Sequence, residues 1–244
     1  MSLTKPLILL VPGLDGTGGL YEPQIPALEE HFRVCAVRFQ SIPGFGFPDL
    51  VRELEAETGA EPPGSITVVG ESFGGPVAVH FALAFPERVR LLVLINTFSY
   101  YRWRLRIRLA CLTSPLLRAA GFRQVKDFIA GRLLRWEGID PVGLDRYYEV
   151  IRRVDLGAYR RRLELVREVD LRHRLGEIRI PTLILASGAD KIVPSAAEAH
   201  FMASKIPTAQ VREFPRAGHA LLLTPGFSLS DYVSPHRPRE GRAV

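Results

Sequence analysis

Short apolar segments rich in valine, isoleucine and leucine recur along the chain, bounded by glycine and proline. Such runs are typical of strands buried on both faces of a parallel sheet. The predicted strands are residues 7–11, 34–39, 66–69, 91–95, 182–186 and 211–214. Stretches long enough for helices separate them, the clearest being residues 48–58, 75–85 and 195–206. This alternation predicts an α/β fold with a mostly parallel sheet of about six strands.

The last of these helices begins at Ser195, and Glu198 follows three positions later. A serine and a glutamate at this spacing form a capping box, in which their side chains satisfy two unpaired amides at the helix N-terminus. We therefore expect Ser195 to cap this helix.

The strand pattern stops between residues 97 and 179, where apolar residues recur with mostly helical spacing among many arginines. This predicts a helical cap, residues 97–179, inserted into a core formed by residues 1–96 and 180–230. Within the cap, residues 101–109 alternate arginine with apolar side chains, a period of two that favours extended structure. Residues 231–244 contain prolines and several charges, and we expect a disordered tail.

The net charge of +6 is unevenly distributed. The predicted cap carries nineteen lysines and arginines against ten acids, about +9, whereas the remainder sums to about −3. A field of one sign attracts an anionic substrate, an acidic partner or a phospholipid surface, although solvated helix faces have the same composition. No nucleic-acid-binding motif accompanies the charge, so we expect no nucleic-acid partner.

The two cysteines, Cys35 and Cys111, have neither C-x-x-C spacing nor a neighbouring histidine pair. This argues against a disulfide framework or a zinc site, and we expect reduced cysteines and no metal. The early apolar segment, residues 7–11, is too short to span a bilayer and lacks the flanks of a secretory signal. We therefore expect a soluble, cytoplasmic protein, with association to a membrane surface left open by the basic cap.

A glycine-flanked serine follows the third predicted strand directly. Residues 70–74 read Gly-Glu-Ser-Phe-Gly and open the next helix. This is the G-x-S-x-G nucleophile elbow, in which a sharp strand-to-helix turn projects the serine hydroxyl and the glycines let the two backbones approach. An ordinary glycine-rich turn would share the letters but not the strand before and the helix after. The sequence therefore predicts Ser72 as a nucleophile.

A glycine-rich loop, residues 11–19, follows the first predicted strand. A dinucleotide site needs G-x-G-x-x-G, but this spacing puts Tyr21 where the third glycine belongs, and no phosphate-loop lysine follows. The alternative is an oxyanion loop, in which the Leu14 amide joins the Phe73 amide to bind the negative oxygen of a tetrahedral intermediate. We favour this second interpretation.

A serine nucleophile needs a base and a group that orients the base. His219 lies just after the last predicted strand, and Asp190 follows the strand 182–186. Because Ser195 is expected to cap the next helix, capping does not explain Asp190, although a simple turn aspartate is the competing interpretation. The remaining histidines lie in helical runs, in the cap or away from strand ends: His31, His80, His173, His200 and His236.

The chain order of serine, acid and histidine, with residues 12–18 and 70–75, resembles the α/β-hydrolase superfamily over nearly the whole length. Within it the chain resembles the esterase, lipase and thioesterase branch, with some similarity to acyltransferases of the phytyl ester synthase kind. Members of the superfamily usually have two extra strands before the oxyanion loop. Here the loop follows the first strand, which implies a smaller sheet.

The resemblance implies that a carboxylic ester or thioester with a hydrophobic acyl group acylates Ser72, and that water activated by His219 then releases the acid. No metal or organic cofactor is implied. We expect Trp103 and Trp136 to line an acyl pocket and the cap arginines to meet an anionic group, with ordinary cap packing as the alternative. An acyltransferase that uses an alcohol acceptor and a non-catalytic ligand-binding protein on the same fold both stay open.

Overall fold

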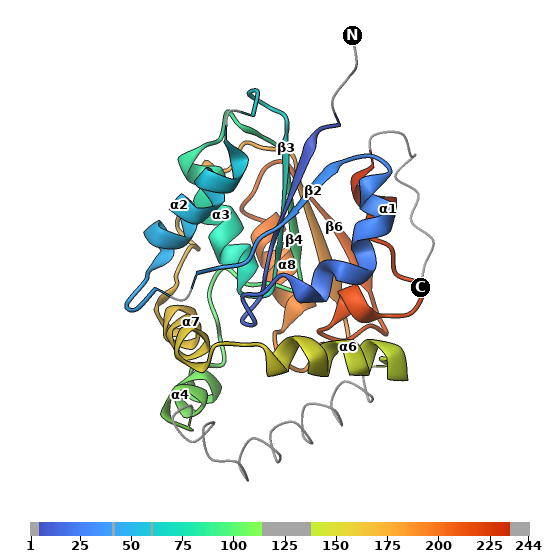
Figure 1. Cartoon of the computed structure of the whole chain (residues 1–244). Helices are drawn as coiled ribbons and strands as arrows, with labels where there is room; N and C mark the ends of the chain where they lie inside the picture. The colour runs from blue at the N-terminus through green and yellow to red at the C-terminus, as the bar shows by residue number, and fades with distance from the viewer. Residues whose placement is uncertain (1–4, 41, 60, 114–137, 235–244) are drawn as a thin grey trace.

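The computed structural model describes residues 5–40, 42–59, 61–113 and 138–234 (Figure 1). Six parallel strands form one sheet in the order β2-β1-β3-β4-β5-β6. The strands are β1 (Leu7–Val11), β2 (Arg33–Ala36), β3 (Ile66–Glu71), β4 (Val89–Ile95), β5 (Thr182–Ser187) and β6 (Ala209–Phe214). The predicted α/β fold and its six-stranded parallel sheet are confirmed.

Helices cover both faces of this sheet, with α2 and α3 on one side and α1 on the other (Figure 1). Successive strand residues point to opposite faces, so Leu9 packs into the first layer and Leu10 into the second. Covering on both faces explains why the inner strands β1, β3, β4 and β5 are mostly apolar, whereas the edge strands β2 and β6 carry exposed charged residues. The first layer contains α2 (Phe47–Thr58), α3 (Gly74–Ala84) and α8 (Ser195–Ala203), and the second α1 (Ile25–Glu29), α9 (Ser230–Val233) and the short helices η1 (Gly19–Gln24) and η4 (Leu221–Leu223).

The segment between β4 and β5 is helical in its described part. It contains α4 (Arg104–Thr113), α6 (Pro141–Arg152), α7 (Leu156–Glu168) and η3 (Leu175–Glu177). Aspartates cap two of these helices: the Asp140 carboxylate accepts the Gly143 amide at 2.8 Å, and Asp155 accepts the Ala158 amide at 2.7 Å. In Figure 1, α6 and α7 lie across the end of the sheet. We call the segment between β4 and β5 the insert, and its status as a separate cap stays a prediction.

The extended structure predicted for residues 101–109 is wrong from Arg104 onward, where α4 begins. The alternation did not reflect one buried and one exposed face, since Leu105 is 80% exposed while Ile107 is buried. Three of the arginines instead lie over aromatic rings, with Arg106 4.1 Å from the centre of the Trp103 ring. Cations that stack on neighbouring rings can follow either backbone period, so the pattern carried no information about a strand.

The predicted capping box at α8 is also wrong. Pro194 holds the N-cap position, and no side chain caps the helix. The Ser195 hydroxyl donates to Asp190, and the buried Glu198 carboxylate accepts a hydrogen bond from Arg102 Nε at 2.6 Å. Both side chains therefore use partners from other segments, and a charge-assisted bond of this kind is stronger than a neutral cap.

The side chain of Gln24, at the end of η1, joins the two ends of the described chain. Its amide nitrogen donates to the carbonyl oxygens of Leu222 and Phe227 at 2.8 and 3.3 Å, and its oxygen accepts the Leu229 amide at 2.8 Å. The fold continues through α9, so residues 231–233 are helical and not part of a tail, and residues 235–244 lie outside the described residues.

Both cysteines, Cys35 and Cys111, are free and half-buried. Burial raises the pKa of the Cys35 thiol to about 11, with further contributions from Glu57. Among the helices of the described residues, none has the length and apolar character needed to cross a membrane.

Candidate active site

The carboxyl ends of the strands lie at one edge of the sheet. The register pairs Val11 with Gly70, and Glu71 with Ile95, so neighbouring strands end at the same level. Loops that follow these strands therefore emerge close together, which is where open α/β sheets bind ligands. The predicted catalytic and oxyanion residues all follow strands at this edge: Leu14, Ser72, Phe73, Asp190 and His219.

Ser72 occupies a sharp turn between β3 and α3, with a backbone φ of +51°. This left-handed conformation is uncommon for a residue with a side chain and is typical of the nucleophile elbow. A Cβ atom on Gly74 would lie 2.3 Å from the Val11 carbonyl oxygen, so only glycine allows this approach. The Thr97 hydroxyl donates to the Ser72 carbonyl oxygen at 2.6 Å and fixes the turn from the end of β4.

The structure brings Ser72, His219 and Asp190 together. The Ser72 hydroxyl lies 3.0 Å from His219 Nε2, and His219 Nδ1 lies 2.7 Å from Asp190 Oδ2. In this arrangement the imidazole can accept the hydroxyl proton while the carboxylate holds the ring and stabilises its protonated form. The geometry is thus that of an activated serine.

The Asp190 carboxylate is held by its own loop and by α8. Its Oδ1 atom accepts the amides of Ile192 and Val193 at 2.8 and 2.9 Å, and the Ser195 hydroxyl donates to Oδ2. Burial alone would raise the pKa of Asp190, but the interaction with His219 and these hydrogen bonds outweigh it and lower that pKa. Asp190 therefore both builds its turn and faces the imidazole, whereas Ser195 contacts the acid.

The sequence interpretation missed Asn96, which directly follows β4. Its side-chain nitrogen donates to the carbonyl oxygens of His219 and Gly218 at 2.8 and 3.2 Å, and its oxygen accepts the Ser187 amide at 2.8 Å. Asn96 is 1% exposed and has a φ of +45°. It therefore joins the loops after β5 and β6. Its position directly after a predicted strand could have indicated it.

A second carboxyl group, that of Glu71, was also missed. Glu71 is buried at the end of β3, and its Oε1 atom lies 3.9 Å from His219 Nε2. The pKa of Glu71 is raised to about 8: burial is the largest cause, His219 lowers the pKa, and Asp15 and Asp190 raise it. At neutral pH this carboxyl group is therefore mostly protonated. Its position next to Ser72 in the motif was the available signal.

The glycine-rich loop after β1 passes beside the nucleophile. A Cβ atom on Gly13 would lie 3.5 Å from the Ser72 Cβ and 2.5 Å from Glu71 Oε2. The buried Asp15 carboxylate accepts both the amide and the hydroxyl of Thr17, at 2.8 and 2.6 Å, which shapes the loop. The neighbouring Leu14 is half-buried, and Phe73 lies at the start of α3. The use of the Leu14 and Phe73 amides as oxyanion donors stays a prediction.

Of the two tryptophans predicted to line an acyl pocket, the structure describes one. Trp103 is half-buried, packs edge-on against the Tyr101 ring at 6.3 Å, and has Arg106 over its face. Trp136 lies outside the described residues. A substrate role for either side chain stays a prediction.

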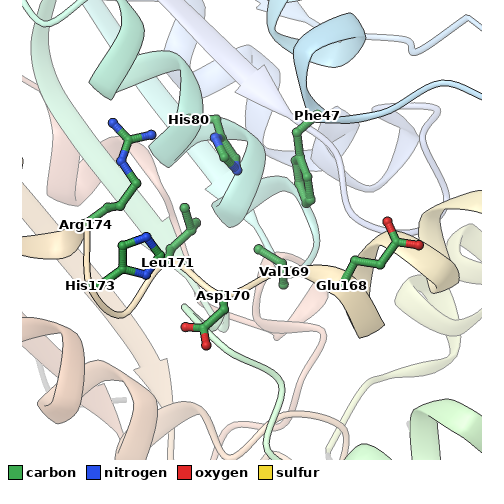
Figure 2. A pocket seen from close by; sticks show the side chains of 8 residues that line it. All are labelled: Phe47, His80, Glu168, Val169, Asp170, Leu171, His173 and Arg174. Atoms are coloured by element: carbon green, nitrogen blue, oxygen red, sulfur yellow. The ribbon is translucent and has the colours of Figure 1, made fainter.

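A pocket of about 290 Å³ lies where α2 and α3 meet the chain that leaves α7 (Figure 2). Its lining mixes aromatic, imidazole, charged and aliphatic side chains: Phe47, His80, Glu168, Val169, Asp170, Leu171, His173 and Arg174. None of the three side chains joined at Ser72 belongs to it, so it is separate from the candidate active site. Within the described ranges, no group of three or more histidine, cysteine or acidic side chains could hold a metal ion.

Two curated hydrolases are similar to this chain over most of its length. RutD of Serratia proteamaculans, a proposed carbamate hydrolase, is 28% identical over 234 residues, which cover 90% of this chain and 86% of that protein. The pimeloyl-[acyl-carrier protein] methyl ester esterase of Pseudoalteromonas atlantica is 28% identical over 237 residues, 88% of each chain.

Solved structures are similar over the same extent. A hydrolase from Pseudomonas aeruginosa superposes with a TM-score of 0.75 at 27% identity, covering 88% of this chain and 83% of that one. An esterase from Exiguobacterium antarcticum, at 18% identity and a TM-score of 0.79, covers 90% of this chain and 87% of its own and shares the fold. The model of the alpha/beta hydrolase fold family matches residues 6–225, and the chain therefore belongs to the α/β-hydrolase fold family.

Proposed function

We propose that this protein is a serine hydrolase that cleaves a carboxylic ester or thioester through an acyl-enzyme on Ser72. The observation that carries this proposal is the continuous hydrogen-bonded series from Ser72 through His219 to Asp190, with distances of 3.0 and 2.7 Å. A hydroxyl, an imidazole and a carboxylate in this order form an activated nucleophile. Family membership and the esterase among the relatives support the same chemistry.

The reaction follows from these positions. His219 Nε2 removes the proton of the Ser72 hydroxyl as the oxygen attacks the acyl carbon, and the Leu14 and Phe73 amides bind the resulting oxyanion. The same nitrogen then gives its proton to the leaving alcohol or thiol when the carbon–oxygen or carbon–sulfur bond breaks. A water molecule deprotonated by His219 attacks the acyl-enzyme, and release of the acid restores Ser72. Asp190 keeps its negative charge throughout and stabilises the imidazolium.

The proposed substrate has a hydrophobic acyl group. Leu14 and Phe73, whose amides would bind the oxyanion, are themselves apolar and pack with the core beside Ser72. The net charge of the predicted cap, about +9, favours substrates that carry a negative group away from the reacting carbonyl. The RutD relatives are named for carbamates, so carbamate analogues belong in the same test.

The test is covalent labelling with an activated fluorophosphonate, followed by turnover of nitrophenyl esters and thioesters of graded chain length. Ser72→Ala should lose the label and lower kcat by about 10⁶. Ser195→Ala is the matched control, because this second serine contacts the same acid, and it should keep the label. Labelling or turnover by Ser72→Ala at the parent's level would refute the mechanism. Faster turnover of a carbamate than of its matched ester would refute the proposed substrate class.

A further inference from the structure

A buried arginine of the insert contacts the loop that follows β1. Arg162 lies on α7, is 2% exposed, and is the largest fully buried side chain among the described residues. Its Nε donates to the Leu14 carbonyl oxygen at 2.8 Å, and its Nη2 donates to the Asp15 carbonyl oxygen at 3.0 Å. One planar group therefore binds two consecutive carbonyls of the predicted oxyanion loop.

The loop is shaped to receive this guanidinium. Gly16 has a φ of +68°, and a Cβ atom there would lie 2.5 Å from Arg162 Cζ. A side chain at position 16 would thus displace the arginine. The other side of the loop is fixed to the segment that follows β2, since the Phe39 amide donates to the Gly16 carbonyl oxygen at 3.0 Å. The loop is held between the end of the sheet and Arg162.

Nearby acidic side chains stabilise the positive charge of Arg162. Burial lowers the pKa of Arg162, while Asp15 and Asp155 are the leading groups that raise it. Arginine nevertheless stays protonated in proteins because its guanidinium is intrinsically so basic. A buried cation is unfavourable unless its hydrogen bonds are satisfied, and an apolar side chain would connect α7 to the core more simply. The two hydrogen bonds from the planar guanidinium fix the orientation of both carbonyls and also attract them to the charge.

We propose that Arg162 is a positioning residue that holds the Leu14 amide in the orientation that binds the oxyanion. The inference rests on the proposed function, because it needs an acyl-transfer step at Ser72. Fixing the carbonyls of Leu14 and Asp15 holds the two peptide planes that follow the Leu14 residue. The Gly16 amide, at the end of the second plane, donates to the Gly13 carbonyl oxygen at 3.1 Å, and that carbonyl shares its peptide plane with the Leu14 amide. The insert thereby helps to form the oxyanion site, and a movement of α7 away from the loop would release the Leu14 amide.

The experiment compares Arg162→Met and Arg162→Lys with Arg160→Met. Arg160 lies on the same helix but is 54% exposed and pairs along the helix with Glu164 at 3.3 Å. The readouts are kcat, KM and the inhibition constant of an arylboronic acid, which forms a tetrahedral anion on a serine. For both Arg162 variants we expect kcat and boronate affinity to fall together by about 10- to 100-fold, while KM changes by less than about three-fold. Arg160→Met should match the parent.

Chemical rescue separates positioning from folding. Guanidinium ion, at concentrations that leave the melting temperature unchanged, should restore part of kcat to Arg162→Ala and none to Arg160→Ala. If the Met and Ala variants do not fold, Arg162→Lys still tests the inference, because lysine keeps the positive charge but cannot bind both carbonyls with one planar group. Folded Arg162 variants with parental kcat and boronate affinity would overturn the inference, as would a loss confined to KM. Absence of turnover in the parent would instead overturn the proposed function.

Discussion

The Asn96 side-chain amide donates to the His219 carbonyl oxygen at 2.8 Å, so the residue that ends β4 holds the histidine that follows β6. The two residues are 123 positions apart in the sequence. The same side chain accepts the Ser187 amide and is almost fully buried. Its removal would leave buried carbonyl and amide groups without their partner.

We therefore expect Asn96→Ala to lower the free energy of unfolding by about 2 to 4 kcal/mol and to reduce kcat, because the imidazole loses its backbone support. Urea unfolding and ester turnover measure the two effects. Asn96→Gly is the control, since glycine adopts a φ of +45° without strain. If Asn96→Gly behaves as the parent does, the hydrogen bonds of this side chain contribute nothing.

Glu71 should set the alkaline limit of activity. Its carboxyl group, with a pKa of about 8, lies against His219 and against Gly13 of the oxyanion loop. As the pH rises through about 8, the group gains a negative charge that opposes the oxyanion. We expect kcat/KM of the parent to fall above this pH and that of Glu71→Gln to stay level. Parallel pH profiles for the two proteins would contradict this role.

The same raised pKa affects stability. Glu71 binds its proton more tightly in the folded chain, at a pKa of about 8, than at its ordinary value of 4.5. The folded state therefore holds more protons in this window, and the stability is complete below about 4.5 and falls as the pH rises toward 8. Between pH 4.5 and 8 we therefore expect the free energy of unfolding of Glu71→Gln to rise relative to that of the parent, by on the order of 5 kcal/mol in total. Denaturant unfolding at several pH values measures the difference, and a constant difference would argue against a buried proton.

Ser195 should support the acid and not act as a nucleophile. Ser195→Ala removes one hydrogen bond to the Asp190 carboxylate, and we expect kcat to fall by about ten-fold. Asp190→Asn should lower kcat by about 10⁴. Ser204→Ala, an exposed serine on the other end of the same helix, is the control and should leave kcat unchanged. A Ser195→Ala loss as large as that of Ser72→Ala would reverse the assignment.

Gly74 should tolerate no side chain. Gly74→Ala places a methyl group against the carbonyl oxygen of Val11, the last residue of β1, and we expect a loss of at least about 2 kcal/mol of unfolding free energy. Gly176→Ala is the matched change, because its nearest non-local atom would be Lys205 O at 3.8 Å. Thermal unfolding of the two variants measures the contrast, and equal melting temperatures would show that the elbow can relax.

Local patterns predicted the sheet well because the four inner strands are mostly buried on both faces and are mostly apolar. The serine, the acid and the histidine could be selected because each follows a strand, and parallel strands end at one edge. The failures came from side chains whose partners lie outside the local motif. Ser195 and Glu198 have the letters of a capping box, yet Asp190 and Arg102 provide their hydrogen bonds.

The arginines at 160, 161 and 162 show the same limit. They are adjacent and chemically identical, but a helix turns by about 100° per residue, so each faces a different environment. Arg160 is exposed, Arg161 is half-buried and donates to the Phe45 carbonyl oxygen, and Arg162 is fully buried on the loop after β1. Nothing in a run of three arginines indicates which one points inward.

The bonds of Gln24 have a consequence for how the chain matures. Its three partners lie 198, 203 and 205 residues downstream. A ribosome that adds about 5 to 20 residues per second needs roughly 10 to 40 s to deliver them. Until then the amide near the beginning of the polypeptide has only water as a partner, so closure of that layer is among the last events of biogenesis.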